Sequence, residues 1–305
     1  MQILTLVLIL LASLFFIGVI NQTKSFVSGR KSPNPWQPLK DWWRLARKSS
    51  IYSRDTSFIF QIAPTISFAS ILCAILVIPF DNHKGLLSFE GDFVFFAYIL
   101  ATGKFFLILG ALDTGSSFEG MGANREALYS LLVEPALFIL LGSLAMVTDH
   151  SSFYDIFTAM HFNTSVSFLI GGLSAYVLVQ VAMIENSRLP IDDPKTHLEL
   201  TMVHEVMVLD HSGFDLAMLQ YANALKFSMY GMLIFNFLHN IELWLPFKIL
   251  MYFGVQYVFA VLIGLLESFR ARAAMQRNPE VIFVLTAMSI LIFFGALILM
   301  NKFSI

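Results

Sequence analysis

Long apolar runs separated by short polar connections organise the whole chain. Each run is long enough to cross about 30 Å of hydrocarbon as a helix. The pattern predicts an all-α, polytopic membrane protein with eight transmembrane helices, folded as a single membrane domain over residues 1–305. The eight runs cover Ile3–Ile20, Phe58–Phe80, Phe93–Leu112, Ala127–Val147, Val166–Ile184, Leu216–Leu238, Phe247–Leu266 and Val281–Met300.

Composition supports this class. Hydrophobic residues make up 57% and charged residues 13% of the 305 positions, which excludes an ordinary soluble domain. The first run lacks a basic segment before it and a clear small-residue cleavage site, so it is expected to be a retained helix.

The basic residues predict the orientation, because Lys and Arg close to helix ends tend to remain cytoplasmic. The even-numbered side and the C-terminus hold only Lys84, Lys248 and Lys302. Both termini are therefore expected outside the cytoplasm, in a multi-pass protein of the cell (inner) membrane. The odd-numbered connections hold Lys24, Arg30, Lys31, Lys40, Arg44, Arg47, Lys48, Arg54, Arg125, Arg188, Lys195, Arg270, Arg272 and Arg277.

The first cytoplasmic connection, residues 21–57, contains a short amphipathic pattern after three prolines. Trp36, Trp42 and Trp43 recur at helical spacing, and basic side chains occupy the other face. This pattern predicts a helix lying in the headgroup layer. The helix is either a simple anchor or the border of an opening through which a lipid-soluble substrate enters from the bilayer.

The chain has few side chains that could bind a cofactor. The single cysteine, Cys73, lies in an apolar run, so neither an iron–sulfur cluster nor a thiolate zinc site is expected. No glycine-rich nucleotide loop ends in Lys-Ser or Lys-Thr. The chain alone is therefore expected to hold no complete active site, no metal and no bound cofactor.

Several charges fall at membrane depth. Glu126 and Glu134 are eight residues apart and can share one polar interior path, and Lys104 and Lys226 are candidate partners. A carboxylate in apolar surroundings must be protonated, hydrated or paired, which suits Glu134 to a proton relay or to a structural ion pair. For Glu126, beside Arg125, stabilisation of the helix start is an equal alternative.

A charged segment, residues 185–215, follows the fifth run. Asp193 and Pro194 predict the start of a helix that carries His197, Glu199, His204 and Glu205. The two histidines share a face, but their seven-residue spacing does not favour a common metal ion. Proton transfer, a quinone-facing role and packing against another subunit remain open for this helical cytoplasmic loop.

Three stretches carry a resemblance to a known family. The strongest is LDTGSSFEGMGANREALYSLLVEPAL, residues 112–137; the others are Glu185, Arg188, Pro190 and Asp192, and DHSG at 210–213. With these motifs the chain resembles the eight-helix membrane subunit shared by respiratory NADH dehydrogenases (subunit 1) and energy-converting nickel-iron hydrogenases, including formate hydrogenlyase, and it is closest to the hydrogenase branch. The second stretch matches that family's E-x-x-R/K-x-P-F-D signature, and the third resembles its EYSG.

The resemblance implies a coupling subunit of a proton-translocating oxidoreductase, itself free of cofactors. An iron–sulfur small subunit and a hydrogenase-like large subunit would dock on the cytoplasmic side, with iron–sulfur clusters and a possible nickel-iron centre. Antiporter-like subunits and lipid would lie alongside, with no nucleic acid. The implied proton-transfer groups are Glu134, Glu185, Asp192, Glu199, Glu267, His197 and His204, and the implied charge partners are Arg30, Arg125, Arg188, Lys104 and Lys226.

Departures from the family pattern limit the transfer of its quinone site. Lys195 and His197 stand where the family commonly has carboxylates, and Ser32 and Asn34 replace glycines. Three alternatives therefore stay open: a stand-alone proton or cation transporter, an NADH:quinone oxidoreductase subunit lining a quinone site, and a simple membrane anchor.

Overall fold

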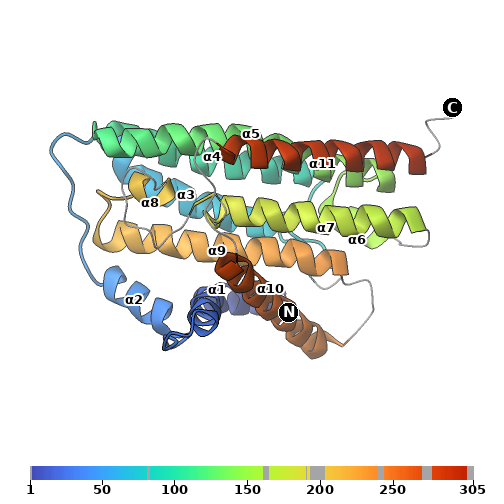
Figure 1. The fold of residues 1–305 in the computed structure, drawn as a ribbon, viewed down its shortest axis with the longest axis horizontal. Helices are drawn as coiled ribbons and strands as arrows, with labels where there is room; N and C mark the ends of the chain where they lie inside the picture. Colours follow the sequence, from blue (N-terminus) through green and yellow to red (C-terminus); the bar gives the residue numbers. More distant parts are fainter. Residues whose placement is uncertain are drawn as a thin grey trace.

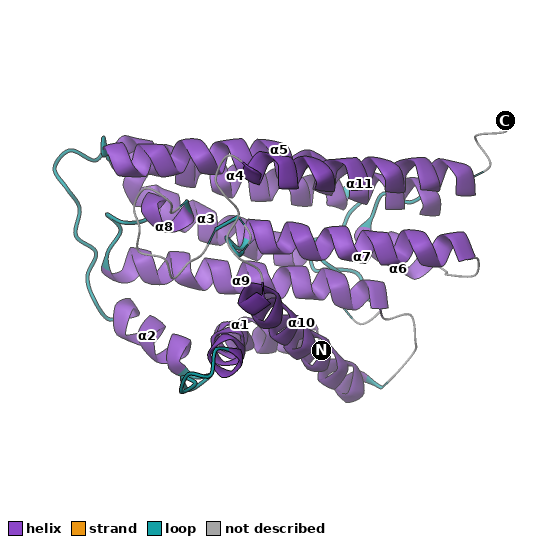
Figure 2. Ribbon diagram, viewed as in Figure 1, coloured by secondary structure: helices purple, strands orange, loops and turns teal. Residues whose placement is uncertain are grey.

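The computed structural model describes residues 2–80, 83–160, 165–189, 191–192, 203–238, 244–269 and 277–300. Over these ranges the regular elements are all helical (Figure 2). The predicted all-α class is therefore confirmed. The helices are α1 Gln2–Val27, α2 Gln37–Ala46, α3 Phe58–Val77, α4 Asp92–Asp113, α5 Ser117–Thr148, α6 Phe153–Ala159, α7 Ser165–Glu185, α8 His204–Met207, α9 Gly213–Leu238, α10 Leu245–Phe269 and α11 Asn278–Leu299.

The long helices form one bundle (Figure 1). In that view α4, α5 and α11 lie along one side, α7 and α9 occupy the middle, and α1 and α10 cross the opposite side at an angle. The consecutive helices α3 and α4 pack against each other. Helices distant in sequence also pack together, as α5 does with α11 and α1 with α10.

Seven of these helices are long and apolar enough to span a membrane: α1, α3, α4, α5, α7, α10 and α11. The sixth predicted run corresponds to α9, which has 26 residues but falls outside this set. Gln220, Asn223, Lys226 and Asn236 lower its hydropathy. The prediction of eight equivalent apolar spans is therefore close, but it is not reproduced in full.

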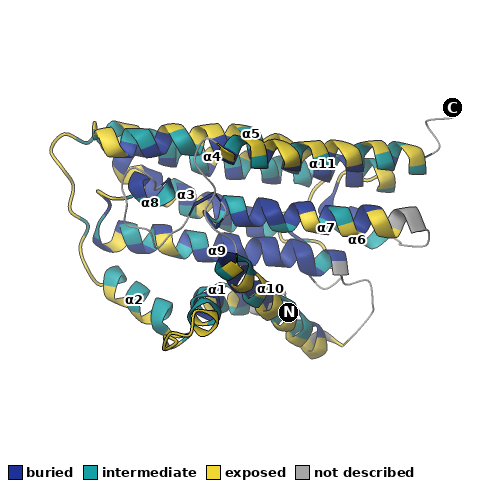
Figure 3. Ribbon diagram, viewed as in Figure 1, coloured by how far each residue is buried: buried dark blue, intermediate teal, exposed yellow. Residues whose placement is uncertain are grey.

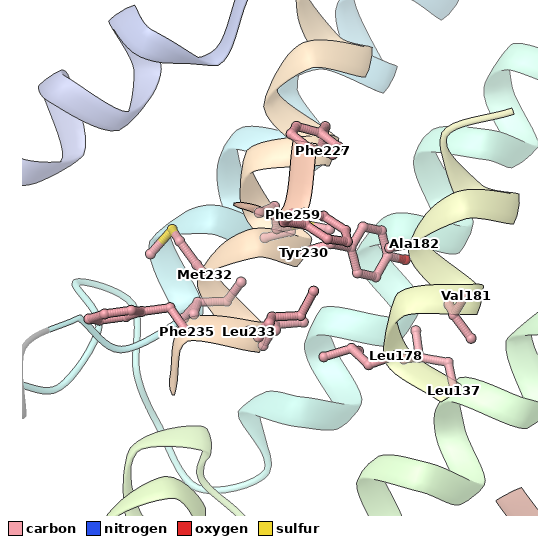
Figure 4. Close-up of a cluster of buried hydrophobic side chains, with 14 of the residues drawn as sticks. Leu137, Leu178, Val181, Ala182, Phe227, Tyr230, Met232, Leu233, Phe235 and Phe259 are labelled. Carbon is pink, nitrogen blue, oxygen red and sulfur yellow. The ribbon is translucent and has the colours of Figure 1, made fainter. Parts of the chain in front are cut away.

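The central position of α9 explains how it tolerates these polar residues. Contacts with α1, α2, α3, α7 and α10 surround it, and its second half is almost wholly buried (Figure 3). Phe227, Leu233 and Phe235 pack into the main hydrophobic core together with Leu178 and Val181 of α7 (Figure 4). A helix shielded from lipid needs less apolar surface than one that faces it.

Helix α5 begins ten residues before the predicted run. Gly115, with a φ of +67°, makes the turn between α4 and α5, and the helix then starts at Ser117. Its polar first turns are covered by the 203–210 segment, because Glu119 is buried and accepts a hydrogen bond from the Asp210 backbone N–H. Glu126 therefore lies inside the helix, and its predicted place at the helix start is wrong.

One end of the bundle holds the connection between α1 and α3 and the starts of α3, α5 and α9. We call this end the basic end. The Ser57 N–H before α3 donates to Asp113 at the end of α4 over 2.7 Å. Ser212, just before α9, accepts a hydrogen bond from the Ile51 N–H over 3.0 Å. At the opposite end, Asp92 accepts a hydrogen bond from the Phe153 N–H at the start of α6 over 2.7 Å.

Candidate functional site

Lys104 is the centre of a buried charge cluster. It lies in the apolar helix α4, and its side chain is 11% exposed. Its ammonium group lies 2.5 Å from Glu185 Oε1 and 3.8 Å from Glu126 Oε1, and it donates to Ser130 Oγ over 3.0 Å. A buried ammonium group needs such partners, because desolvation without them costs several kcal/mol.

Lys226 of α9 approaches the same carboxylate from another side. Its Nζ lies 3.7 Å from Glu185 Oε2 and donates to the Glu185 carbonyl oxygen over 3.0 Å. Glu185 is the last residue of α7, where unpaired carbonyl groups and the helix dipole favour a cation. One ammonium group thus satisfies both the side chain and the helix end.

Helix α5 presents a polar stripe to this cluster. Glu126, Ser130 and Glu134 are spaced four residues apart, so they share one face. The structure brings Glu126 and Ser130 into contact with Lys104, and Glu134 lines the same cleft as Lys104. Four helices therefore contribute ionisable groups to one interior site.

A cleft of about 360 Å³ leads from this cluster to the side of the bundle. Lys104, Glu185 and Tyr230 of α9 form its buried wall, and the exposed Glu134 also lines it. Tyr98 and Leu131, which also line it, are 66% and 72% exposed. The cleft therefore connects the buried charges to an apolar outer surface between α4 and α5.

The charged connection folds back on the cluster through Asp192. Asp192 Oδ2 accepts hydrogen bonds from the N–H groups of Val203 and His204, over 3.3 and 3.1 Å. One carboxylate thus ties together the two ends of residues 193–202. His197 and Glu199 lie outside the described residues.

His204 opens the short helix α8 and contacts α9. Its Nε2 lies 2.9 Å from Asn223 Nδ2, so a neutral ring can accept that hydrogen bond. Burial lowers the pKa of His204 to about 4, although Glu126 opposes the shift. His204 is therefore a neutral hydrogen-bonding group at neutral pH.

A second ion cluster, of Glu267, Lys24 and Arg188, joins α10, α1 and the turn after α7. Glu267 Oε2 lies 2.8 Å from Lys24 Nζ, and its Oε1 lies 3.6 Å from Arg188 Nη1. The Glu267 side chain is fully buried. This triad fixes the turn that begins the charged connection against two spanning helices.

The other two predicted charge partners are Arg30 and Arg125. Arg30 is exposed in the turn after α1. Arg125 donates to the Met121 sulfur over 3.1 Å, one turn earlier on α5.

Two contact residues escaped the sequence analysis, Asn223 and Ser130. Each stands one turn from a recognised charge, Asn223 before Lys226 and Ser130 after Glu126. A polar residue one turn from a charged residue within an apolar run was the sequence feature that could have identified them. The contact of Asn223 with His204 crosses between two elements, and no spacing rule predicts it.

A separate cavity of about 320 Å³ lies between α1, α2, α8 and α9. Leu14 and Ile17 form its apolar part, and Asp41, His204 and Asn223 contribute polar groups. The amphipathic helix α2 therefore borders a cavity, through its residues Pro38 and Asp41.

Known proteins with similar sequences are membrane subunits of redox complexes. The chain is 28% identical to hydrogenase-4 component C of Escherichia coli (strain K12), over 72% of this chain and 69% of that protein. It is 27% identical to formate hydrogenlyase subunit 4 of the same organism, over 68% and 67%. It is 25% identical to a subunit of the NADH-quinone oxidoreductase of Pelagibacter ubique (strain HTCC1062), over 80% and 76%.

The fold has a solved counterpart. A chain of the membrane-bound sulfane sulfur reductase, an archaeal respiratory membrane complex, superimposes with a TM-score of 0.81 at 17% identity, covering 97% of this chain and 98% of that one. The family model described as NADH dehydrogenase matches residues 1–299. The chain therefore belongs to the NADH dehydrogenase family of multi-pass membrane subunits, of the subunit 1 type.

Proposed function

We propose that this chain is the membrane-anchoring and proton-coupling subunit of a multi-subunit, hydrogenase-like oxidoreductase. The observation that supports this most is the meeting of Lys104, Glu126, Glu185 and Lys226 from four separate helices inside the bundle. Ionisable groups are costly at that depth, and in membrane proteins they commonly mark proton or ion pathways.

The proton step belongs to the carboxylates around Lys104. Glu185 and Glu126 share one ammonium group, so protonation of either would change the attraction that Lys104 offers the other. Glu134 lies on the outward side of this pair and lines the lateral cleft. A proton released by the paired carboxylates would therefore reach Glu134 next, and then the surface between α4 and α5.

Redox events would act through the charged connection. Asp192 holds the start of α8, and the Glu267 triad holds Arg188 at the end of α7. A docked arm that moved this connection would shift His204 and Glu185 together, because Asn223 and Lys226 lie one turn apart on α9. Glu199 and His197 remain candidates within the connection.

The partners follow from the chemistry that this chain lacks and from its relatives. We expect an iron–sulfur small subunit and a hydrogenase-like large subunit at the basic end, which would face the cytoplasm with both termini on the other side of the inner membrane. Antiporter-like subunits would cover the exposed Tyr98 and Leu131 beside the lateral cleft. No redox step is assigned to this chain itself.

Gentle purification tests the assembly. The full-length tagged chain, extracted from its native membrane in mild detergent, should bring iron–sulfur subunits with visible-region absorption and membrane subunits of the antiporter type. Recovery of the chain alone, with proton flux in liposomes, would instead establish the stand-alone transporter. A complex that keeps full proton coupling when Glu134 and Glu199 are each replaced by Gln would leave only an anchor.

The 320 Å³ cavity supports a second candidate function, the binding of a quinone or another lipid-soluble carrier. Its wall joins apolar groups of α1 to the hydrogen-bonding groups of His204 and Asn223. An apolar pocket with a few polar groups suits such a headgroup. Asn223→Leu should weaken binding of a quinone analogue to the purified complex, whereas unchanged affinity would exclude this cavity as the site.

A further inference from the structure

We propose that the exposed face of α2 is a binding site for the headgroup of an anionic phospholipid. Lys40, Trp43, Arg44 and Arg47 are exposed and stand at positions i, i+3, i+4 and i+7. That spacing places all four on one stripe of the helix. The stripe holds three cations and one aromatic ring.

The other face of α2 is occupied by the protein. Trp42 Nε1 donates to the Ala217 carbonyl oxygen over 3.1 Å, and its ring lies 5.3 Å from that of Tyr221 on α9. Trp36, just before the helix, packs against Phe15 of α1 with ring centroids 4.9 Å apart. These contacts fix which side of α2 turns outward.

The outward side chains are arranged for an anion. The Arg47 guanidinium lies 4.7 Å above the Trp43 ring, which holds it in place without neutralising its charge. Arg44 lies 3.7 Å from Asp41, but its side chain is 73% exposed, so this pair leaves most of its donors accessible. Lys40 extends the positive charge by one turn.

Lipid fits this face better than an acidic protein surface does. The neighbouring helix α1 exposes apolar side chains, with Leu11 at 68%, and Figure 1 shows α2 outside the bundle near α1. Trp43, which is 52% exposed, is suited to the boundary between headgroups and acyl chains. A bilayer offers anionic headgroups and apolar contact on the same side.

Quenching by brominated lipids tests the proposal. The full chain is reconstituted with phosphatidylcholine and phosphatidylglycerol, and either lipid carries the bromine atoms. Tryptophan fluorescence should be quenched more by brominated phosphatidylglycerol than by the brominated phosphatidylcholine at equal fraction. Trp43→Phe should remove most of this difference, because that ring lies within the stripe.

Charge variants complete the test. Each basic residue near an anionic surface contributes about five-fold in local affinity, so Arg44→Gln should lower the preference by about that factor. The triple variant K40Q/R44Q/R47Q should abolish it. The control Lys84→Gln removes a basic residue from the opposite end, beside Tyr154, and should leave the preference unchanged.

Two results would overturn the proposal. Equal quenching of the wild-type chain by both lipids would show that the stripe does not select an anion. A preference that vanishes in the complex with its partner subunits would show that a protein covers α2. Neither result depends on the proton path, so the proposed coupling function stands or falls separately.

Discussion

Lys104 of α4 and Glu185 of α7 form an ion pair of 2.5 Å within the bundle, although 81 residues separate them in the chain. Lys226 approaches the same carboxylate from α9. The two ion pairs therefore join three helices, and they place two ammonium groups and one carboxylate at the point where these helices meet.

Replacing one partner of this pair should destabilise the protein strongly. Lys104→Met removes the closest cation from Glu185, and the loss of unfolding free energy should be about 3 kcal/mol or more, as for other broken buried pairs. The double variant K104M/E185Q should recover part of this loss, since residue 185 then carries no charge that has lost its closest cation. Thermal unfolding of both variants and of Glu185→Gln measures the coupling, and purely additive losses would contradict it.

Acid should destabilise the basic end through His211. Its ring stacks on Phe60 with centroids 4.0 Å apart, and within the described residues neither ring nitrogen has a hydrogen-bond partner. Burial lowers the pKa of His211 to about 4, against the opposing charges of Asp215 and Asp210. The unfolded chain therefore binds the proton first, and stability that is complete above pH 6.5 falls as the pH decreases towards 4.

His211→Phe keeps the stacked ring and removes this titration. The variant should lose less stability than the wild type between pH 6.5 and 4, by up to about 3 kcal/mol. Unfolding in detergent across this range measures the difference. His83→Phe changes an exposed histidine at the other end, and it should follow the wild-type curve. Parallel curves for all three proteins would refute the assignment.

Gly231 permits a close contact between α9 and α10. A Cβ at this position would overlap the amide group of Gln256, which is fully buried. Gly231→Ala should cost about 1–3 kcal/mol, the usual range for overpacking. Gly254→Ala on α10, where a Cβ meets open space, should be neutral or slightly stabilising. Equal midpoints for the two variants would show that the contact does not constrain the helices.

The helices could be predicted from the sequence because apolar runs reveal spans directly. The start of α5 could not, because its polar first turns are buried by a distant segment: Glu119 accepts a hydrogen bond from the Asp210 backbone. The hydropathy pattern therefore placed the start of that helix ten residues too late, which put Glu126 at the helix start. The central position of α9 could not be predicted either, since its burial depends on its neighbours.

The site was predictable in its residue types and less so in its pairings. Membrane depth singled out Lys104, Lys226 and Glu134, but both lysines were candidates for any carboxylate. The structure assigns both to Glu185 and adds Glu126 to Lys104. Such pairings depend on how helices pack across the bundle, which the spacing within one helix does not determine.

Proton translocation by the Glu134→Gln variant tests the central claim most directly. Glu134 lines the lateral cleft, whereas the ion pairs of Lys104 are with Glu126 and Glu185, so this change should leave the complex assembled. The intact complex in liposomes should keep its electron-transfer partners. It should translocate far fewer protons per electron than the wild type does. Glu90→Gln, an exposed control at the opposite end, should pump as the wild type does. Wild-type pumping by Glu134→Gln would contradict the proposed path.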